Sequence, residues 1–364
     1  MRIRYLDQKE GLRHLADRMK LLKQIFAHLL VREDGDAERA LETLEMIGER
    51  HGLFDDDLTF EDFKKQLLEE KIVSQSPNGF GLTPKGERFV RSSTFEQIFG
   101  NLDFGSDGGH RTSHLGGQGE RLSETRPYAF GDEVQDIDFN RSFTNALLRN
   151  QGQGFGLAEQ DLEVFETEHH TSMATVLMLD VSHSMILYGE DRITPAKRVA
   201  LALTELILTR YPKDAFHVVL FGDDAREISV KDLTYAGVGP YHTNTHAGLR
   251  LARHILMRKK HANKQVFMIT DGKPTALFEE GQLYLNPFGL DRKIVNKTLD
   301  EAAECRRYGI PITTFMIAQD SMLVRFVERL TETNQGRAFF SSVDNLEQTV
   351  FVDFVRNRRR RMRT

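Results

Sequence analysis

The chain has 364 residues, of which 40% are hydrophobic, and its formal net charge at pH 7 is −5. This length exceeds one average domain, so we expect two domains and a small third region. The mildly acidic total argues against a general nucleic-acid coat, and the single cysteine, Cys305, excludes an internal disulfide and suits a reducing compartment. The first residues lack the apolar core of a signal peptide. No apolar stretch approaches the ~20 residues needed to cross a bilayer, so we expect a cytoplasmic protein.

A smaller, mainly helical domain is predicted over residues 1–101. Apolar residues recur at three- and four-residue spacing over 8–31 and again over 37–51, which indicates two amphipathic helices. Thr59, with Asp62 three residues later, forms a capping pattern for a third helix.

The end of this region has the pattern of a winged helix. Residues 72–83 alternate around a Ser-Pro-Asn-Gly turn, which predicts a hairpin, and Pro84 suits the first turn of a further helix. This order resembles the end of a winged-helix module. Because the preceding helix, 60–71, is charge-balanced rather than basic, a protein-contact or structural role is favoured over DNA binding.

Residues 102–125 change in character. Glycines alternate there with serine, aspartate, histidine and arginine, so little apolar surface is available to bury. We expect a flexible linker and a domain boundary in this stretch. The following segment, 126–172, is interpreted as a strap that precedes the second domain.

The second domain is predicted over 173–355. The unbroken apolar run from Ala174 to Leu179 is typical of a strand that is buried on both faces of a parallel sheet. Strand and helix patterns then alternate, with Thr194 and Pro195 as the expected cap and first turn of the first helix. Regular alternation predicts an α/β fold with a doubly wound, mostly parallel sheet. An arginine-rich tail, 356–364, closes the chain.

Oxygen-bearing side chains follow the predicted strands at one edge of this sheet. The first strand ends in an Asp-x-Ser-x-Ser pattern, a threonine lies in the loop before a later helix, and an Asp-Gly pair ends another strand: Asp180, Ser182, Ser184, Thr243 and Asp271. The carboxyl edge of an open α/β sheet is where ligands bind. Hydroxyl and carboxylate oxygens are the ligands that Mg²⁺ prefers, so this edge is a candidate metal site.

These motifs, in this order, resemble the metal-ion-dependent adhesion site of von Willebrand factor A domains, over about residues 173–350. The resemblance implies a Mg²⁺ ion, or alternatively Mn²⁺, that is held by Asp180, Ser182, Ser184, Thr243 and Asp271 and bridges to an acidic residue of a partner. The family often has Gly-Gly before the threonine, and here Tyr241-His242 stands there. Thr245 is therefore an alternative to Thr243 as the ligand.

The strap also carries a resemblance, to bacterial proteins of the DUF58 type that are associated with MoxR ATPases. Five residues match their Gly-Asp…Ile-Asp-Trp…Ser segment, and Phe139 replaces the tryptophan: Gly131, Asp132, Ile137, Asp138 and Ser142. This resemblance implies a non-enzymatic adaptor whose partner is a MoxR-type AAA+ ATPase. The sequence contains no Walker-type loop, so ATP hydrolysis would belong to the partner.

Two other functions are weighed against the adaptor. A nucleic-acid-associated regulator would use the winged-helix-like region and the arginine tail, although no aromatic residues are interleaved there to stack on bases. A metal-dependent hydrolase would need a general base, for which His183 is the candidate between the two serines. Alternation along an extended chain points His183 away from Ser182 and Ser184, so this alternative is the least favoured.

Overall fold

The computed structural model describes residues 2–77, 79–99, 120–129, 137–149, 156–168, 172–189, 191–271, 273–286, 290–317, 321–341, 346 and 349–350. The chain divides into two compact units, residues 1–104 with 172–354 and residues 105–171 with 355–364. Three predicted features lie outside the described residues: residues 102–119 of the linker, the DUF58-like residues Gly131 and Asp132, and the arginine tail.

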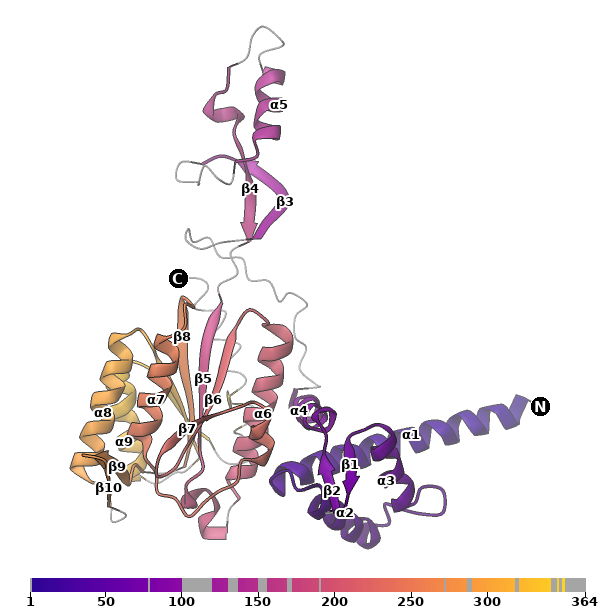
Figure 1. Cartoon of the computed structure of the whole chain (residues 1–364). Coiled ribbons are helices and arrows are strands. Elements are labelled where there is room, and N and C mark those ends of the chain that lie inside the picture. Colours follow the sequence, from indigo (N-terminus) through magenta and orange to yellow (C-terminus); the bar gives the residue numbers. More distant parts are fainter. Residues whose placement is uncertain are drawn as a thin grey trace. The chain divides into compact units, whose positions relative to one another are not determined.

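A six-stranded sheet forms the centre of the first unit (Figure 1). Its middle strand, β5 (Met173–Asp180), is buried along its whole length, as the apolar run predicts. The strand order is β12-β11-β8-β5-β6-β7, with bounds Arg337–Phe340, Ile312–Met316, Asn263–Thr270, Met173–Asp180, Ala215–Phe221 and Ala225–Ile228. All neighbours are parallel except the edge strand β7, which is antiparallel to β6. The predicted doubly wound, mostly parallel sheet is therefore confirmed.

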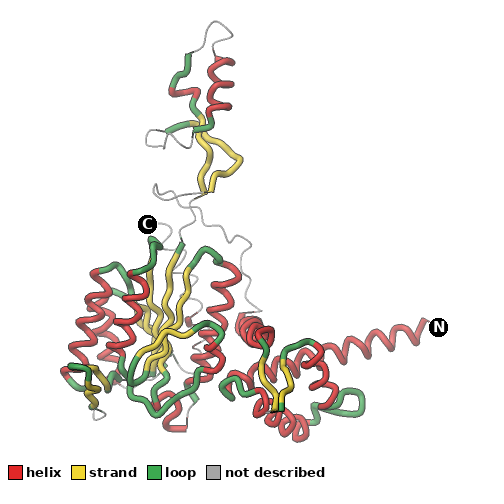
Figure 2. The backbone as a smooth tube through the Cα atoms, viewed as in Figure 1, coloured by secondary structure: helices red, strands yellow, loops and turns green. Residues whose placement is uncertain are grey.

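Helices cover both faces of this sheet (Figure 2). They are α6 (Ile193–Arg210), α7 (Thr245–Met257), α8 (Arg292–Arg307) and α9 (Ser321–Asn334). The first helix begins one residue before the predicted cap: the Asp191 carboxylate accepts from the Thr194 N–H at 3.0 Å, so Thr194 lies inside the helix. The Thr-Pro pattern alone does not show that the Asp191 carboxylate, three residues earlier, can accept a hydrogen bond from the first turn of the helix.

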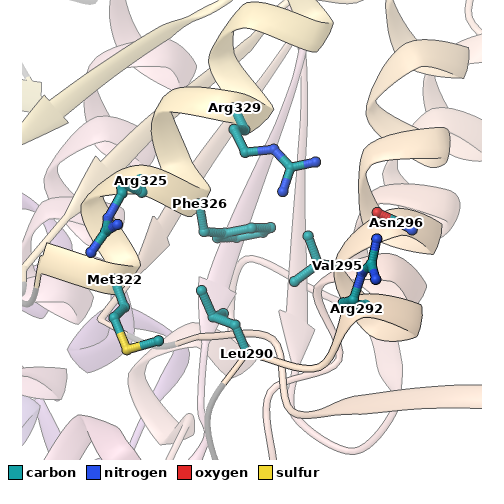
Figure 3. Close-up of a pocket in the computed structure, with 8 residues that line it drawn as sticks. All are labelled: Leu290, Arg292, Val295, Asn296, Met322, Arg325, Phe326 and Arg329. Atoms are coloured by element: carbon teal, nitrogen blue, oxygen red, sulfur yellow. The ribbon is translucent and has the colours of Figure 1, made fainter.

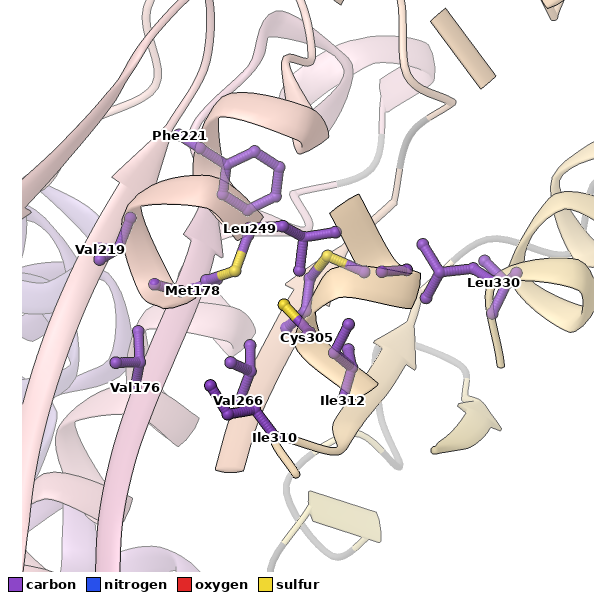
Figure 4. Close-up of a cluster of buried hydrophobic side chains, with 14 of the residues drawn as sticks. Val176, Met178, Val219, Phe221, Leu249, Val266, Cys305, Ile310, Ile312 and Leu330 are labelled. Atoms are coloured by element: carbon purple, nitrogen blue, oxygen red, sulfur yellow. The ribbon is translucent and has the colours of Figure 1, made fainter. Parts of the chain in front are cut away.

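An apolar core lies between the sheet and α7, α8 and α9. Met178 and Phe221 pack beside Leu249 of α7, and Cys305 and Leu330 extend the cluster into α8 and α9 (Figure 4). A Cβ on Gly248 would lie 2.5 Å from the Met178 methyl and 3.3 Å from the Phe221 Cβ, so a larger residue there would force these side chains to shift. Burial raises the pKa of the Cys305 thiol to about 12, as expected of a packed cysteine.

A mainly helical region precedes the sheet, as predicted. Its elements are α1 (Arg2–Arg32), α2 (Ala37–His51), α3 (Phe60–Glu69), the hairpin β1 (Val73–Ser76) and β2 (Gly79–Leu82), and α4 (Pro84–Phe99). The capping box is present, with the Thr59 hydroxyl accepting from the Asp62 N–H at 3.1 Å. Helices α1 and α4 pack against α6, which is apolar around most of its circumference and is buried on two sides.

One lysine joins this helical region to α6. Lys197 is fully buried, and its ammonium group donates to the Val31 carbonyl at 2.9 Å and to the Asp34 carboxylate at 2.7 Å. Burial lowers the pKa of Lys197, and the bond to Asp34 opposes that shift. A second ion pair, Arg91–Glu205 at 3.5 Å, also joins α4 to α6.

The second unit contains an antiparallel strand pair, β3 (Glu120–Pro127) and β4 (Glu163–Glu168), and helix α5 (Phe139–Arg149). Strand β3 begins at Glu120, inside the stretch 102–125 that the sequence predicts as linker. The strap residues have local roles here. Asp138 caps α5 by accepting from the Asn140 N–H at 3.0 Å, and the Ser142 hydroxyl accepts from the Glu163 N–H at 2.9 Å, which ties the helix to β4.

Several elements of the first unit were not predicted, among them a 3₁₀ helix over Asp232–Tyr235. A hairpin formed by β9 (Ala276–Glu279) and β10 (Gln282–Leu285) follows β8, and a 3₁₀ helix spans His183–Gly189. In the part of the chain that the structure describes, no helix is both long and apolar enough to cross a membrane.

The buried lysine leads to a prediction about stability. Replacing Asp34 by alanine should lower the free energy of unfolding by about 2 kcal/mol, because Lys197 keeps its charge without a carboxylate. This is less than the roughly 3–5 kcal/mol of a fully buried pair, since the Asp34 side chain is 51% exposed. Urea unfolding would measure the change. Adding Lys197→Met to the variant should restore most of the loss, and no recovery would contradict the role of the buried charge.

Candidate functional site

Asp180 ends the central strand and is fully buried. One carboxylate oxygen accepts from the Ser182 N–H at 2.9 Å, and the other accepts from the hydroxyl of Thr270, the last residue of β8, at 2.5 Å. Burial raises the pKa of Asp180 to about 7, and the neighbouring Asp271 carboxylate contributes to this rise. Thr270 was not among the predicted site residues, although it directly precedes Asp271 in the sequence.

Three of the predicted residues form one hydrogen-bonded chain. The hydroxyl oxygens of Ser182 and Ser184 are 3.1 Å apart, and the Ser184 hydroxyl donates to an Asp271 carboxylate oxygen at 2.7 Å. Ser182 and Asp271 are buried and Ser184 is half-buried. The strand ends at Asp180 and Thr270 therefore bring these side chains together, as the parallel arrangement predicts.

Thr243 is not joined to this chain by the hydrogen bonds of the described residues. Its N–H donates to the Thr275 hydroxyl at 3.0 Å, and its carbonyl accepts from the Thr275 N–H at 3.0 Å, so the loop is fixed to the approach of β9. The loop also contacts the serine segment, because the His183 N–H donates to the Tyr241 carbonyl at 3.0 Å. Thr243 and Thr245 are both buried, so the structure leaves the choice between them open.

The histidines near the site face other partners. His183 is exposed and Ser182 beside it is buried, although His183 begins a 3₁₀ helix and does not continue an extended chain. The imidazole Nδ1 of His242 is 2.9 Å from an Asp223 carboxylate oxygen. Neither histidine is joined to Ser184 or Asp271 by the hydrogen bonds of the described residues.

Comparison with known proteins places this chain in a family. A family model described as "Rv0959-like protein, vWA domain" matches residues 173–355, which is half of the chain. The chain belongs to this vWA family. A second model, "Rv0959-like protein, third domain", matches residues 120–167, the part of the chain that holds β3, α5 and β4.

Two mycobacterial proteins are similar to this chain along most of its length. The "Uncharacterized protein Rv0959" of Mycobacterium tuberculosis and the "Uncharacterized protein Mb0984" of Mycobacterium bovis are each 32% identical over 311 residues. The match covers 83% of this chain but 46% of each relative, so the chain spans about half the length of these proteins.

Solved structures with a similar fold include the PilB minor pilin from Streptococcus sanguinis and the SpRpn10 VWA domain. The pilin is 14% identical with a TM-score of 0.43, and the match covers 57% of this chain and 66% of the pilin. The SpRpn10 domain is 15% identical with a TM-score of 0.37, over 49% of this chain and 94% of that domain.

An arginine in the vWA domain adds a positive charge to the site. Arg192, directly before α6, donates to the second carboxylate oxygen of Asp271 at 2.7 Å, and its side chain is 14% exposed. Two carboxylates and one guanidinium therefore meet at this edge of the sheet. The sequence analysis missed Arg192, and its only signal was its position just before the first helix that follows the Asp-x-Ser-x-Ser segment.

The donor set fits a hard divalent cation. Serine hydroxyls and carboxylate oxygens converge here, which are ligands of the type that Mg²⁺ and Mn²⁺ prefer. Among the described residues there is no cluster of three or more histidine, cysteine, aspartate or glutamate side chains that would offer a different kind of metal site.

The raised pKa of Asp180 predicts how stability depends on pH in EDTA. The folded state holds a proton on Asp180 up to about pH 7, whereas the unfolded chain releases it near the ordinary pKa of 3.8, so stability should fall as pH rises between these values. Asp180→Asn should flatten that decline in thermal melts from pH 4 to 8. Asp224→Asn, at an exposed carboxyl, is the control and should keep the wild-type slope. An unchanged slope in Asp180→Asn would contradict the assignment.

Proposed function

We propose that this chain is a non-enzymatic adaptor that binds an acidic residue of a partner protein through a Mg²⁺ ion, with Mn²⁺ as the alternative. The ion would be held by Asp180, Ser182, Ser184, Thr243 and Asp271. The observation that carries the proposal is the hydrogen-bonded chain from Ser182 through Ser184 to Asp271, beside the buried Asp180.

The charges at the site favour an acidic partner. Asp180 and Asp271 contribute two negative charges when both are ionised, and Arg192 contributes one positive charge. A divalent ion makes the sum positive by one, so the loaded site attracts a further carboxylate. When bound, the ion supplies a point of attachment for that carboxylate. The hydrogen bonds from Arg192 to Asp271 and from Thr270 to Asp180 orient the two carboxylates.

A MoxR-type AAA+ ATPase is the proposed partner. This part of the proposal rests on the resemblance of the Ile137, Asp138 and Ser142 segment, and on the lack of a Walker-type loop in this sequence. Nothing in the part of the chain that the structure describes favours the nucleic-acid alternative, whose arginine tail lies outside it.

The proposal predicts that partner capture depends on the metal and on Ser184. The tagged full chain should retain an AAA+ ATPase from its native lysate with magnesium and release it in EDTA. Ser184→Ala should lose the retained ATPase in both buffers, because it removes one oxygen donor and the bond to Asp271. Ser229→Ala, at an exposed serine outside the site, is the matched control and should behave as wild type. Equal retention of the ATPase in magnesium and in EDTA would refute the metal bridge.

A second experiment decides between the two threonines. Thr243→Ala should abolish the rise in melting temperature that magnesium gives the wild-type chain, while Thr245→Ala should keep it. The opposite result would move the ligand to the first residue of α7. If neither substitution changes the magnesium response, the threonine has no part in the site.

A further inference from the structure

A surface cavity of about 350 Å³ lies between the first turns of α8 and α9 (Figure 3). Its floor is apolar. Val295 of α8 and Phe326 of α9 are 5% and 3% exposed, and both belong to the apolar core between the sheet and α7, α8 and α9. In Figure 3 the Phe326 ring faces Val295 across the cavity. The volume is at the lower end of the range typical of ligand pockets and has room for one or two apolar side chains.

Three arginines surround this apolar floor. Arg292 comes from α8, Arg325 and Arg329 come from α9, and all three are exposed. Figure 3 shows Arg329 and Arg292 on opposite sides of the cavity, with Arg325 on the outer side of Phe326. An incoming group would therefore meet apolar surface in the centre and guanidinium groups at the rim.

The Asp291 carboxylate offsets the positive end of α8, so the arginines supply the positive charge at the cavity. Neither α8 nor α9 has an acidic residue in its first turn, where aspartate or glutamate would be stabilising. The α8 cap, Asp291, is already engaged by the N–H groups of Lys293 and Ile294 and by the Asn286 amide. Asp320 precedes α9 in the sequence and lies outside the described residues.

The cavity lies at the same edge of the sheet as the candidate metal site. Strand β11 is parallel to β8, and Met316 pairs with Thr270 at their carboxyl ends. Helix α8 runs from this edge back to the start of β11, and α9 leaves this edge after β11 ends. The first turns of both helices are therefore at the edge where Asp180 and Asp271 lie, and a protein on this edge can reach the cavity.

We propose that this cavity is a docking site for a short acidic segment of a partner protein, with an apolar side chain on Phe326 and flanking carboxylates paired to Arg292 and Arg329. Guanidinium groups bind carboxylates in a bidentate geometry, which gives this occupant charge complementarity. The docking site needs no metal and is independent of the proposed function.

A labelled peptide tests this docking site. The probe is fluorescein-labelled Glu-Asp-Glu-Leu-Phe-Asp-Glu-Asp, and the measurement is fluorescence anisotropy with the full chain in EDTA, which excludes a metal bridge. Wild type should bind the peptide, and the double variant Arg292→Glu with Arg329→Glu should bind it at least ~10-fold more weakly, because two attractive contacts become repulsive. Asn296→Glu adds a carboxylate to the lining without removing an arginine and should also weaken binding.

Matched controls separate this cavity from general attraction of acidic peptides. Arg306→Glu, in the last turn of α8, should bind like wild type, since it changes the same charge at the far end of the helix. A peptide with Ser-Ser in place of Leu-Phe should bind at least ~10-fold more weakly, because the apolar floor is then unused.

Three outcomes would overturn the docking site. They are no binding of the probe by wild type at about 0.1 mM, unchanged binding in the arginine double variant, and equal binding of the Ser-Ser peptide. Thermal melts of each variant confirm that it is folded, as expected for substitutions at exposed side chains.

Discussion

The structure depends on how two buried carboxylates are accommodated at one edge of a parallel sheet. Asp180 is fully buried and Asp271 nearly so, and like charges in such a place destabilise each other. The chain compensates with donors from separate segments: the Ser182 N–H, the hydroxyls of Ser184 and Thr270, and the Arg192 guanidinium. These bonds fix the start of α6, the end of β8 and the loop after β5 relative to one another.

A buried pair of carboxylates that needs this many donors has a stability cost, which suggests selection for what the site binds rather than for folding alone. Arg192 balances part of the charge permanently, and a divalent ion would reverse the sign of the remainder. The same edge carries the arginine-rimmed cavity between α8 and α9. The arginine rim is positive by itself, whereas the carboxylate site would become positive only with the proposed divalent ion.

Much of this arrangement could be predicted from the sequence, because the carboxyl ends of parallel strands lie at the same edge of a sheet. Two apolar runs placed both carboxylates at one edge: one run ends in Asp180, and the other ends directly before Asp271. The structure confirms the sheet that these runs predict. The family match to residues 173–355 confirms the vWA assignment. The metal and the partner stay predictions.

Other features could not be predicted, for physical reasons. Arg192 reaches Asp271 across 79 positions of sequence, and the direction of a long side chain in a loop is not encoded in residue spacing. The β9–β10 hairpin was missed because its turn, Glu280-Gly281, is not one of the usual Asn-Gly or Asp-Gly signals, although both residues have positive φ. That hairpin matters because Thr275 at its start holds the Thr243 loop.

The contact between Lys197 and the helical region has a consequence for how the protein is made. Val31 and Lys197 are 166 residues apart, so the surface that α1 and α4 bury against α6 leaves the ribosome long before α6 exists. At the usual rate of synthesis that interval is on the order of ten seconds or more. The apolar surface that α1 and α4 later bury against α6 therefore stays exposed until α6 has been synthesised.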